Sequence, residues 1–209
     1  FVNTLPNQPD GTLDLDEVLR LTEANRWGGR VAVGHATKLS AVPPARLDSI
    51  AARLASAWAA VTALPATDLF LMGREHDHAV PRGVAPVHRL AAAGVTASLA
   101  TNNVLNPFTP FGDASLLRMA NLYANVAQLG RPEELAACWD LVTTRPARLM
   151  NLGDYGVVPG APADVVVLDA PDPATAVATL AQPVLGIKAG RRSFTRPLPV
   201  LHPPGGGPA

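Results

Sequence analysis

The sequence is poor in the residues that several classes of protein require. Its 209 residues include one cysteine, Cys138, which excludes an internal disulfide framework and a cysteine-based metal cluster. It carries 17 Lys and Arg against 17 Asp and Glu, and this balance argues against a broad basic surface for nucleic acid or an anionic membrane. The sequence has no run of about 18 uncharged apolar residues, which is the length that a bilayer-spanning helix needs. We expect a cytoplasmic protein that binds neither nucleic acid nor a membrane.

The beginning of the chain has neither an initiator methionine nor the basic and apolar segments of a signal peptide. At roughly 150 residues per domain, the length allows one large domain, or a medium domain with an appendage. We therefore expect a fragment that begins inside a larger protein.

Helical and strand patterns alternate along most of the chain. Helices are predicted over 13–26, from Pro43-Pro44 onward, and over 84–93, 114–129 and 132–143; strands are predicted over 30–34, 57–64 and 95–100. The alanine content of 57–64 leaves that assignment open. This alternation favours parallel βα units. Short strands at 164–169, 184–188 and 191–195 indicate a small β region, and the Pro- and Gly-rich stretch 197–209 indicates a disordered tail.

His35 is the first candidate for chemistry, because it directly follows the predicted strand 30–34. In α/β proteins the carboxyl ends of the strands carry the active site. There His35 could bind a metal or assist a reacting water, or it could simply cap the strand end.

The other histidines are weaker candidates. His76 and His78 could share a metal if they lay on a strand, but the neighbouring Gly and Pro residues favour a solvated loop over 72–83. His88 is expected at a helix surface or cap, and His202 in the tail.

The loop 101–112 is rich in asparagine and phenylalanine. Asn102, Asn103 and Asn106 could recognise a polar heterocycle, or they could be ordinary turn residues. Phe108 and Phe111 could line a pocket for a flat ligand, or they could plug the mouth of a barrel. Cys138 is expected to pack in a helical core as a small hydrophobic residue.

Several motifs together resemble the cytosine deaminase-like amidohydrolases. The resemblance depends on their order and spacing, because no single motif is unique. In chain order they are Arg30–His35, Gly73-Arg74, Arg82–Val84, Asn106–Gly112, Thr143–Arg148, Asn151–Gly156, Gly160–Asp169 and Gly190-Arg191. They cover nearly the whole chain except the first dozen residues and the tail.

The resemblance implies an α/β fold, a distorted (β/α)8 TIM-like barrel with a small β-sandwich built from both chain ends. By this analogy the chain is the C-terminal half of such a protein. Residues 1–152 would hold roughly the last three barrel strands, 153–196 the C-terminal strands of the composite sandwich, and 197–209 the tail.

The resemblance also implies one divalent metal, iron or zinc, whose bound water attacks a carbon that bears an exocyclic amine. The implied ligands are a His-x-His pair on the first strand, a His on the fifth and an Asp on the eighth, and a Glu after the fifth strand moves protons. His35 matches the sixth-strand histidine that contacts the water. The first-strand pair is not in this chain, and the fifth-strand His and Glu either precede Phe1 or are replaced around Phe1–Leu5.

Asn102 falls at the position of the eighth-strand aspartate, and Asn103 at that of a second carboxylate. An amide oxygen can bind a metal weakly but cannot act as a base near neutral pH. We therefore expect His35 and Asn102 as catalytic residues, Asn102 as a weak metal ligand, and Asn103 and Phe108 as substrate-binding residues. The departure implies that the site uses another base, lacks the metal, or is catalytically dead.

Three interpretations follow. The leading one is a fragment of a hydrolase of non-peptide carbon–nitrogen bonds that deaminates a cytosine-like nitrogen heterocycle with a metal-activated water. The alternative is a catalytically impaired relative that binds a small heterocycle without metal, and the third is a non-functional truncation. A small heterocycle is the expected partner in the first two, and a homo-oligomer remains open.

Overall fold

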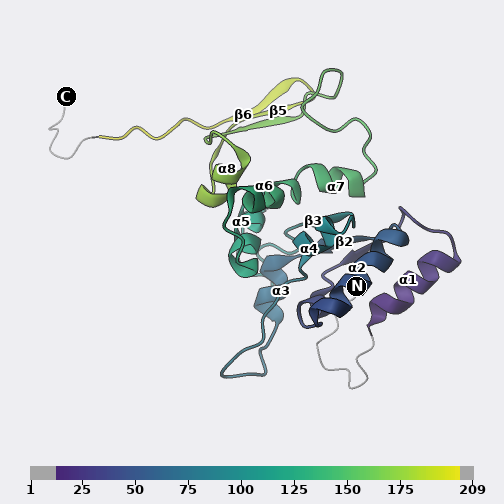
Figure 1. Cartoon of the computed structure of the whole chain (residues 1–209). Coiled ribbons are helices and arrows are strands. Elements are labelled where there is room, and N and C mark those ends of the chain that lie inside the picture. Colours follow the sequence, from purple (N-terminus) through teal and green to yellow (C-terminus); the bar gives the residue numbers. More distant parts are fainter. Residues whose placement is uncertain (1–12, 203–209) are drawn as a thin grey trace.

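Figure 1 shows the computed structural model, in which residues 13–202 are described. These residues form two three-stranded sheets joined by helices. The first sheet has the order β1-β2-β3 and is parallel throughout, with β1 at Ala32–Gly34, β2 at Ala60–Ala63 and β3 at Ala97–Leu99. The second is antiparallel, with the order β4-β5-β6, and its strands are Val165–Leu168, Pro183–Lys188 and Arg191–Thr195.

The helices alternate with these strands as the sequence pattern predicts. They are α1 (Asp14–Ala24), the 3₁₀ turn η1 (Thr37–Ser40), α2 (Pro44–Ser56), α3 (Pro65–Leu71), α4 (Val87–Ala92), α5 (Leu116–Ala127), α6 (Pro132–Asp140), α7 (Thr144–Leu149) and α8 (Pro173–Thr179).

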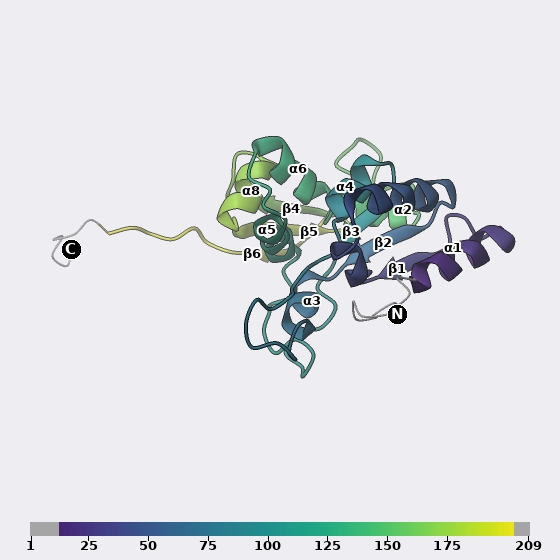
Figure 2. The same cartoon turned by 60° about the horizontal axis from the view of Figure 1, so that its bottom comes forward.

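Side chains of the parallel sheet alternate between its two faces, as the pleat requires. Val33, Val61 and Leu99 are buried in the hydrophobic core, which also contains the apolar face of α2. Figure 2 shows α2 and α4 lying over this sheet. On the other face, Thr62 and Ser98 stand side by side and their hydroxyl oxygens are 2.9 Å apart. One face of the sheet is thus apolar and covered, and the other carries small polar groups.

Helix α2 illustrates why these segments become helical. It begins at Pro44, whose fixed φ suits the first turn and whose missing N–H has no intrahelical partner to lose. Its buried residues are Leu47, Ile50, Ala51 and Leu54, a spacing that places them on one face of a helix. The helix therefore forms because that face packs against the sheet.

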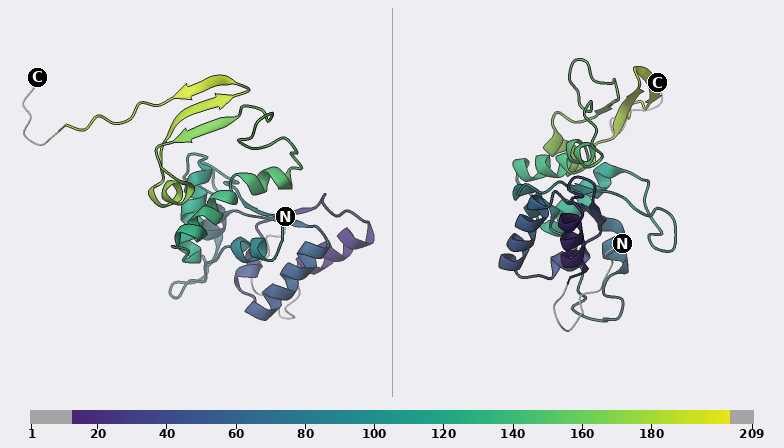
Figure 3. Two further views of the ribbon diagram at one scale, coloured as in Figure 1. Left: turned by 45° about the horizontal axis from the view of Figure 1, so that its top comes forward. Right: turned by 90° about the vertical axis from the view of Figure 1, so that its right-hand side faces the viewer.

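The second sheet lies beyond the helices of the C-terminal half, on the side away from the first sheet (Figure 3). Helix α8 joins β4 to β5 and is anchored to α5, because the Asn121 amide donates to the Val177 carbonyl oxygen at 2.8 Å. All five residues of β6 are exposed.

The sequence misses three short helices, α3, α7 and α8, each of six or seven residues. Such helices show too few turns for an apolar period to stand out. The segment between β4 and β5 is therefore not composed of strands and loops alone. Its helix has an acidic N-cap, since Asp172 Oδ1 accepts from the backbone N–H of Thr175 at 2.8 Å.

The other predicted elements are confirmed within a few residues at their ends. The alanine-rich segment 57–64 contains β2, and 72–83 is a loop that reaches out below α3 (Figure 1). Residues 197–202 have no regular secondary structure, and the rest of the expected tail lies outside the described residues, as does the region around Phe1–Leu5. Among residues 13–202, every helix is too short or too polar to cross a bilayer.

Loop 101–112 is fastened to the start of α3 by two buried threonines. Thr67 Oγ1 and Thr109 Oγ1 are 2.6 Å apart, and both residues are almost completely buried. Because each hydroxyl lies out of reach of bulk water, the pair secures the loop against the helix.

A double-mutant cycle tests this link. Thr67→Val and Thr109→Val should each lower the free energy of unfolding by about 1–3 kcal/mol, since each leaves a buried hydroxyl without its partner. The double variant should cost less than the sum of the two. Urea unfolding of the four proteins gives the coupling, with Thr195→Val in exposed β6 as a near-neutral control. If the losses in unfolding free energy of the two single variants simply add in the double variant, the hydrogen bond between Thr67 and Thr109 is contradicted.

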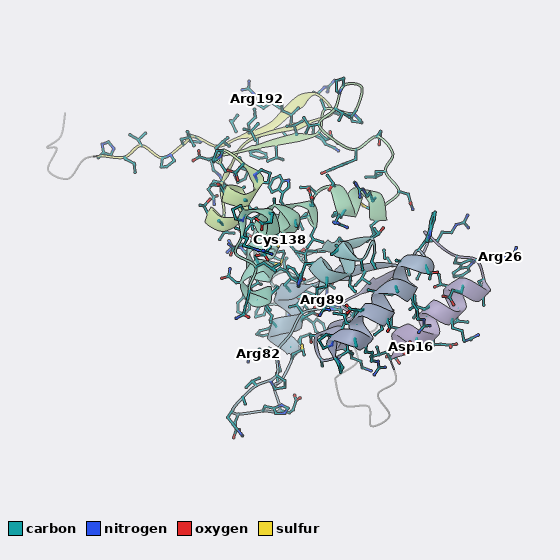
Figure 4. All side chains as sticks on the ribbon, viewed as in Figure 1. Asp16, Arg26, Arg82, Arg89, Cys138 and Arg192 are labelled. Atoms are coloured by element: carbon teal, nitrogen blue, oxygen red, sulfur yellow. The ribbon has the colours of Figure 1, made fainter. Side chains whose placement is uncertain are left out.

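Cys138 is completely buried in the core, as expected for a structural cysteine, and Figure 4 places it within the helical layer. Burial raises the pKa of its thiol from 9.0 to about 11. Since only the thiolate reacts, native Cys138 should alkylate at pH 8 at least about 100-fold more slowly than an ordinary thiol.

Mass spectrometry after iodoacetamide treatment measures this rate, with the chain in concentrated guanidinium chloride as the control. Rapid labelling of the folded chain would contradict the burial of Cys138 on α6.

Candidate functional site

The candidate site lies at the carboxyl end of the parallel sheet, where His35 follows β1. His35 is 1% exposed. Its backbone is left-handed, with φ of 67°, and Ala36 continues in this region with φ of 51°. Left-handed backbone is disfavoured for residues other than glycine, and such strain persists only where the surroundings enforce it. The chain therefore turns sharply at the end of β1 and directs the imidazole inward.

Asp68, on α3, is the closest partner of this imidazole. Its Oδ1 lies 2.6 Å from His35 Nδ1, and both side chains are almost wholly buried. The hydroxyl of Thr37 donates to the same oxygen at 3.4 Å, and the backbone N–H of Leu64 donates to Oδ2 at 3.4 Å. The Thr37 hydroxyl and the Leu64 N–H are donors, and Nδ1 of the imidazole is a third donor in the tautomer that carries its proton there.

Asn102 contacts the other nitrogen of the ring. Its Nδ2 is 3.2 Å from His35 Nε2. Asn102 follows β3, is exposed on its outer side, and has a left-handed φ of 61°. Asp68, His35 and Asn102 thus form a hydrogen-bonded line that runs from the buried core to the surface.

The rest of loop 101–112 is organised by its own asparagines. Asn103 Oδ1 accepts from Asn106 Nδ2 at 2.8 Å. Asn106 Oδ1 in turn accepts from the backbone N–H groups of Phe108 and Thr109, at 3.0 and 3.1 Å. Asn106 is therefore a turn residue, as one of the two sequence interpretations held, and Asn103 has its oxygen engaged within the loop.

The two phenylalanines of this loop have different surroundings. Phe111 packs edge-on against Phe70 of α3, with ring centroids 5.3 Å apart, and the Arg74 guanidinium lies 4.4 Å from the centre of the Phe70 ring. Phe108 is 57% exposed. Both residues are more than half exposed. Phe111 is positioned by its edge contact with Phe70.

The remaining histidines lie outside this group. His76 and His78 are in the exposed loop after α3, beside Glu75 and Asp77 respectively, which confirms the solvated loop. His88 is half-buried rather than at the surface. Its Nδ1 is 2.7 Å from the hydroxyl of Tyr123, and burial lowers the pKa of its imidazole.

Within residues 13–202, no three His, Cys, Asp or Glu side chains gather closely enough to hold a metal ion. His35 and Asn102 offer two neutral donor atoms at most. A tetrahedral site requires four ligands, so these residues do not complete a metal site by themselves.

Sequence reasoning identified His35 and Asn102, which the structure brings together, but it missed Asp68. The local signal for Asp68 is weak: it is a carboxylate on the short helix that follows a buried strand, five residues after β2 ends. That position is equivalent to those of His35 and Asn102 after their own strands, and parallel strands bring such positions to one edge.

Three comparisons with known proteins complete the description. The model of the family described as "Amidohydrolase family" matches residues 7–194. The pterin deaminase of Rhizobium rhizogenes (strain K84 / ATCC BAA-868) is 32% identical over 165 residues, which are 76% of this chain and 36% of that protein.

Two solved structures are also similar. N-isopropylammelide isopropylaminohydrolase from Burkholderia multivorans has a TM-score of 0.73 and 31% identity, over 85% of this chain and 42% of the other. The 5-methylcytosine deaminase from Klebsiella pneumoniae, at 24% identity, supports the fold alone, with a TM-score of 0.87 over 95% of this chain and 48% of the other. The chain thus spans less than half the length of each of these proteins. Because the family match extends over most of the residues, the resemblance expected from the motifs is confirmed, and the chain belongs to the amidohydrolase family.

Proposed function

We propose that the protein containing this chain hydrolyses a carbon–nitrogen bond of a small nitrogen heterocycle, with hydrolytic deamination of a cytosine-like ring as the reaction. The observation that carries this proposal is the hydrogen-bonded line of Asp68, His35 and Asn102 at the carboxyl edge of a parallel sheet in a member of this family. The names of two similar proteins, a pterin deaminase and an N-isopropylammelide isopropylaminohydrolase, support an amine carried by a nitrogen heterocycle as the substrate class.

In this reaction a water oxygen bonds to the ring carbon, the carbon–nitrogen bond breaks, and the amine leaves as ammonia after taking up a proton. A group must accept a proton from the water and return one to the leaving amine. We assign this transfer to His35 Nε2, because Nδ1 is occupied by Asp68 and Nε2 faces the exposed end of the line.

We assign substrate contacts to the loop that follows β3. The exposed ring of Phe108 can stack on a planar heterocycle, and the amide hydrogens of Asn103 can donate to a ring nitrogen or carbonyl. Asn102 holds the Nε2 side of the imidazole.

One divalent metal, iron or zinc, is part of the proposal. When bound, such an ion lowers the pKa of the water it holds toward 7 and so provides hydroxide near neutral pH. Asn102 Oδ1 is the atom of residues 13–202 that we expect to contribute weakly to its coordination, and the other ligands would come from outside these residues.

The second sheet supports a further structural proposal, that 153–196 contribute to a composite β-sandwich. Val166 and Phe194 are exposed apolar side chains on β4 and β6. Such side chains on an open sheet are expected to be covered by another sheet.

Ammonia release is the direct test of the function. The complete protein that contains residues 1–209, supplied with Fe²⁺ or Zn²⁺, should release ammonia from cytosine, 5-methylcytosine or a pterin, and not from a dipeptide amide. Binding of a heterocycle without any turnover would favour the metal-free binding protein instead.

His35→Ala should lower kcat by about 10²–10⁴-fold and leave KM nearly unchanged, since the proton transfer is lost while substrate contacts remain. Steady-state kinetics of the complete protein measure both constants. His78→Ala, in the exposed loop, is the matched control and should behave as wild type. An unchanged kcat in His35→Ala would reduce His35 to a structural residue at the strand end.

Asn102→Asp tests the metal. The substitution restores a negative ligand and a proton acceptor, so the metal bound per chain at a buffered free concentration should rise, and turnover with it. Metal content of the wild type, of Asn102→Asp and of the control Asn125→Asp gives the answer, since Asn125 is an exposed residue of α5. In a metal-free binder the same change would instead weaken heterocycle binding roughly tenfold or more, because the amide donor to the bound ligand is lost.

A further inference from the structure

The family resemblance places an aspartate where this chain has Asn102, yet a carboxylate is present on the opposite side of His35. We infer that Asp68 is a positioning residue that acts through His35: it fixes the tautomer and plane of the imidazole, and so provides the anionic partner that position 102 lacks. This inference rests on the proposed function for its kinetic consequence, but not for its structural one.

The geometry around Asp68 supports this role in two ways. Its partners are the imidazole at 2.6 Å and two weaker donors at 3.4 Å, so its shortest contact is with the ring. An ionised carboxylate can only accept, so beside it the proton of this contact lies on Nδ1 of His35.

The consequence extends to Asn102. With the proton on Nδ1, the Nε2 of a neutral ring carries a lone pair and accepts from the amide N–H of Asn102 at 3.2 Å. The oxygen of that amide is then turned away from the ring. The buried carboxylate of Asp68 thereby orients His35, and His35 in turn orients Asn102 at the exposed side of the site.

The backbone gives an independent indication that this line is constrained. His35, Ala36 and Asn102 all have left-handed φ values, and none is glycine. Strain of this kind gathers at sites where side-chain direction matters. The competing explanation is a purely structural ion pair that fastens α3 to the end of β1, and it predicts a loss of stability without any change at Nε2.

The test combines a spectroscopic and a kinetic measurement. In ¹⁵N-histidine-labelled chain at mildly alkaline pH, with His35 assigned by comparison with His35→Gln, wild type should show a protonated Nδ1 and an unprotonated Nε2. In Asp68→Asn the new amide can either accept from Nδ1–H or donate to Nδ1, so the Nε2–H tautomer should appear. In the complete protein, Asp68→Asn should lower kcat by about 10–100-fold with less change in KM.

Leu69→Ala is the matched control, because Leu69 is the next residue of the same helix and packs against the hydrophobic core. It should lower stability while leaving the tautomer as in wild type. An unchanged tautomer and kcat in Asp68→Asn would overturn the inference. If Asp68→Asn does not fold, an Nε2–H tautomer in the wild type would overturn it on its own.

The two proposals can fail separately. A tautomer change in Asp68→Asn, in a protein that deaminates none of the heterocycles, would support the positioning role and overturn the proposed function. Turnover of a heterocycle by a wild type whose His35 is the Nε2–H tautomer would support the proposed function and overturn the positioning role.

Discussion

The buried contact between Asp68 and His35 is the interaction on which the candidate site depends. It joins residues 33 apart in sequence, on segments that follow two neighbouring parallel strands. A lone carboxylate at this depth would be costly, and so would an imidazole with an unpaired N–H. Each makes the burial of the other acceptable, and this pairing fixes how α3 sits against the end of β1.

The sequence predicts the parts of this arrangement that have a local signal. His35 stands out because a β-branched run ends just before it, and Asn102 because it follows the next predicted strand but one. Asp68 has only a weak signal, since it lies five residues beyond its strand on the short helix α3. The partner of its carboxylate depends on how the ends of two strands meet. Secondary structure can be predicted from the periodicity of one segment. The contact between His35 and Asp68 depends on the pairing of β1 with β2, which no single segment encodes.

The same distinction separates the two ends of the chain. The first sheet could be anticipated in order and direction, because alternating helices and strands leave few parallel arrangements. The second could be anticipated as strands, but not the position of α8. That helix buries Ala176 and Val177, and the Val177 carbonyl also accepts from the Asn121 amide of α5. The metal and the substrate pocket are proposals, because residues 13–202 bring no three His, Cys, Asp or Glu side chains together to hold an ion.

Helix α3 also has a mechanical consequence. Two consecutive residues of this helix make different contacts. Thr67 is hydrogen-bonded to Thr109 of loop 101–112, and Asp68 is hydrogen-bonded to the imidazole of His35. A short rigid segment that carries both attachments transmits any displacement to both at once. A displacement of α3 would therefore shift the loop bearing Phe108 and the ring of His35 together, and with that ring the nitrogen to which we assign proton transfer.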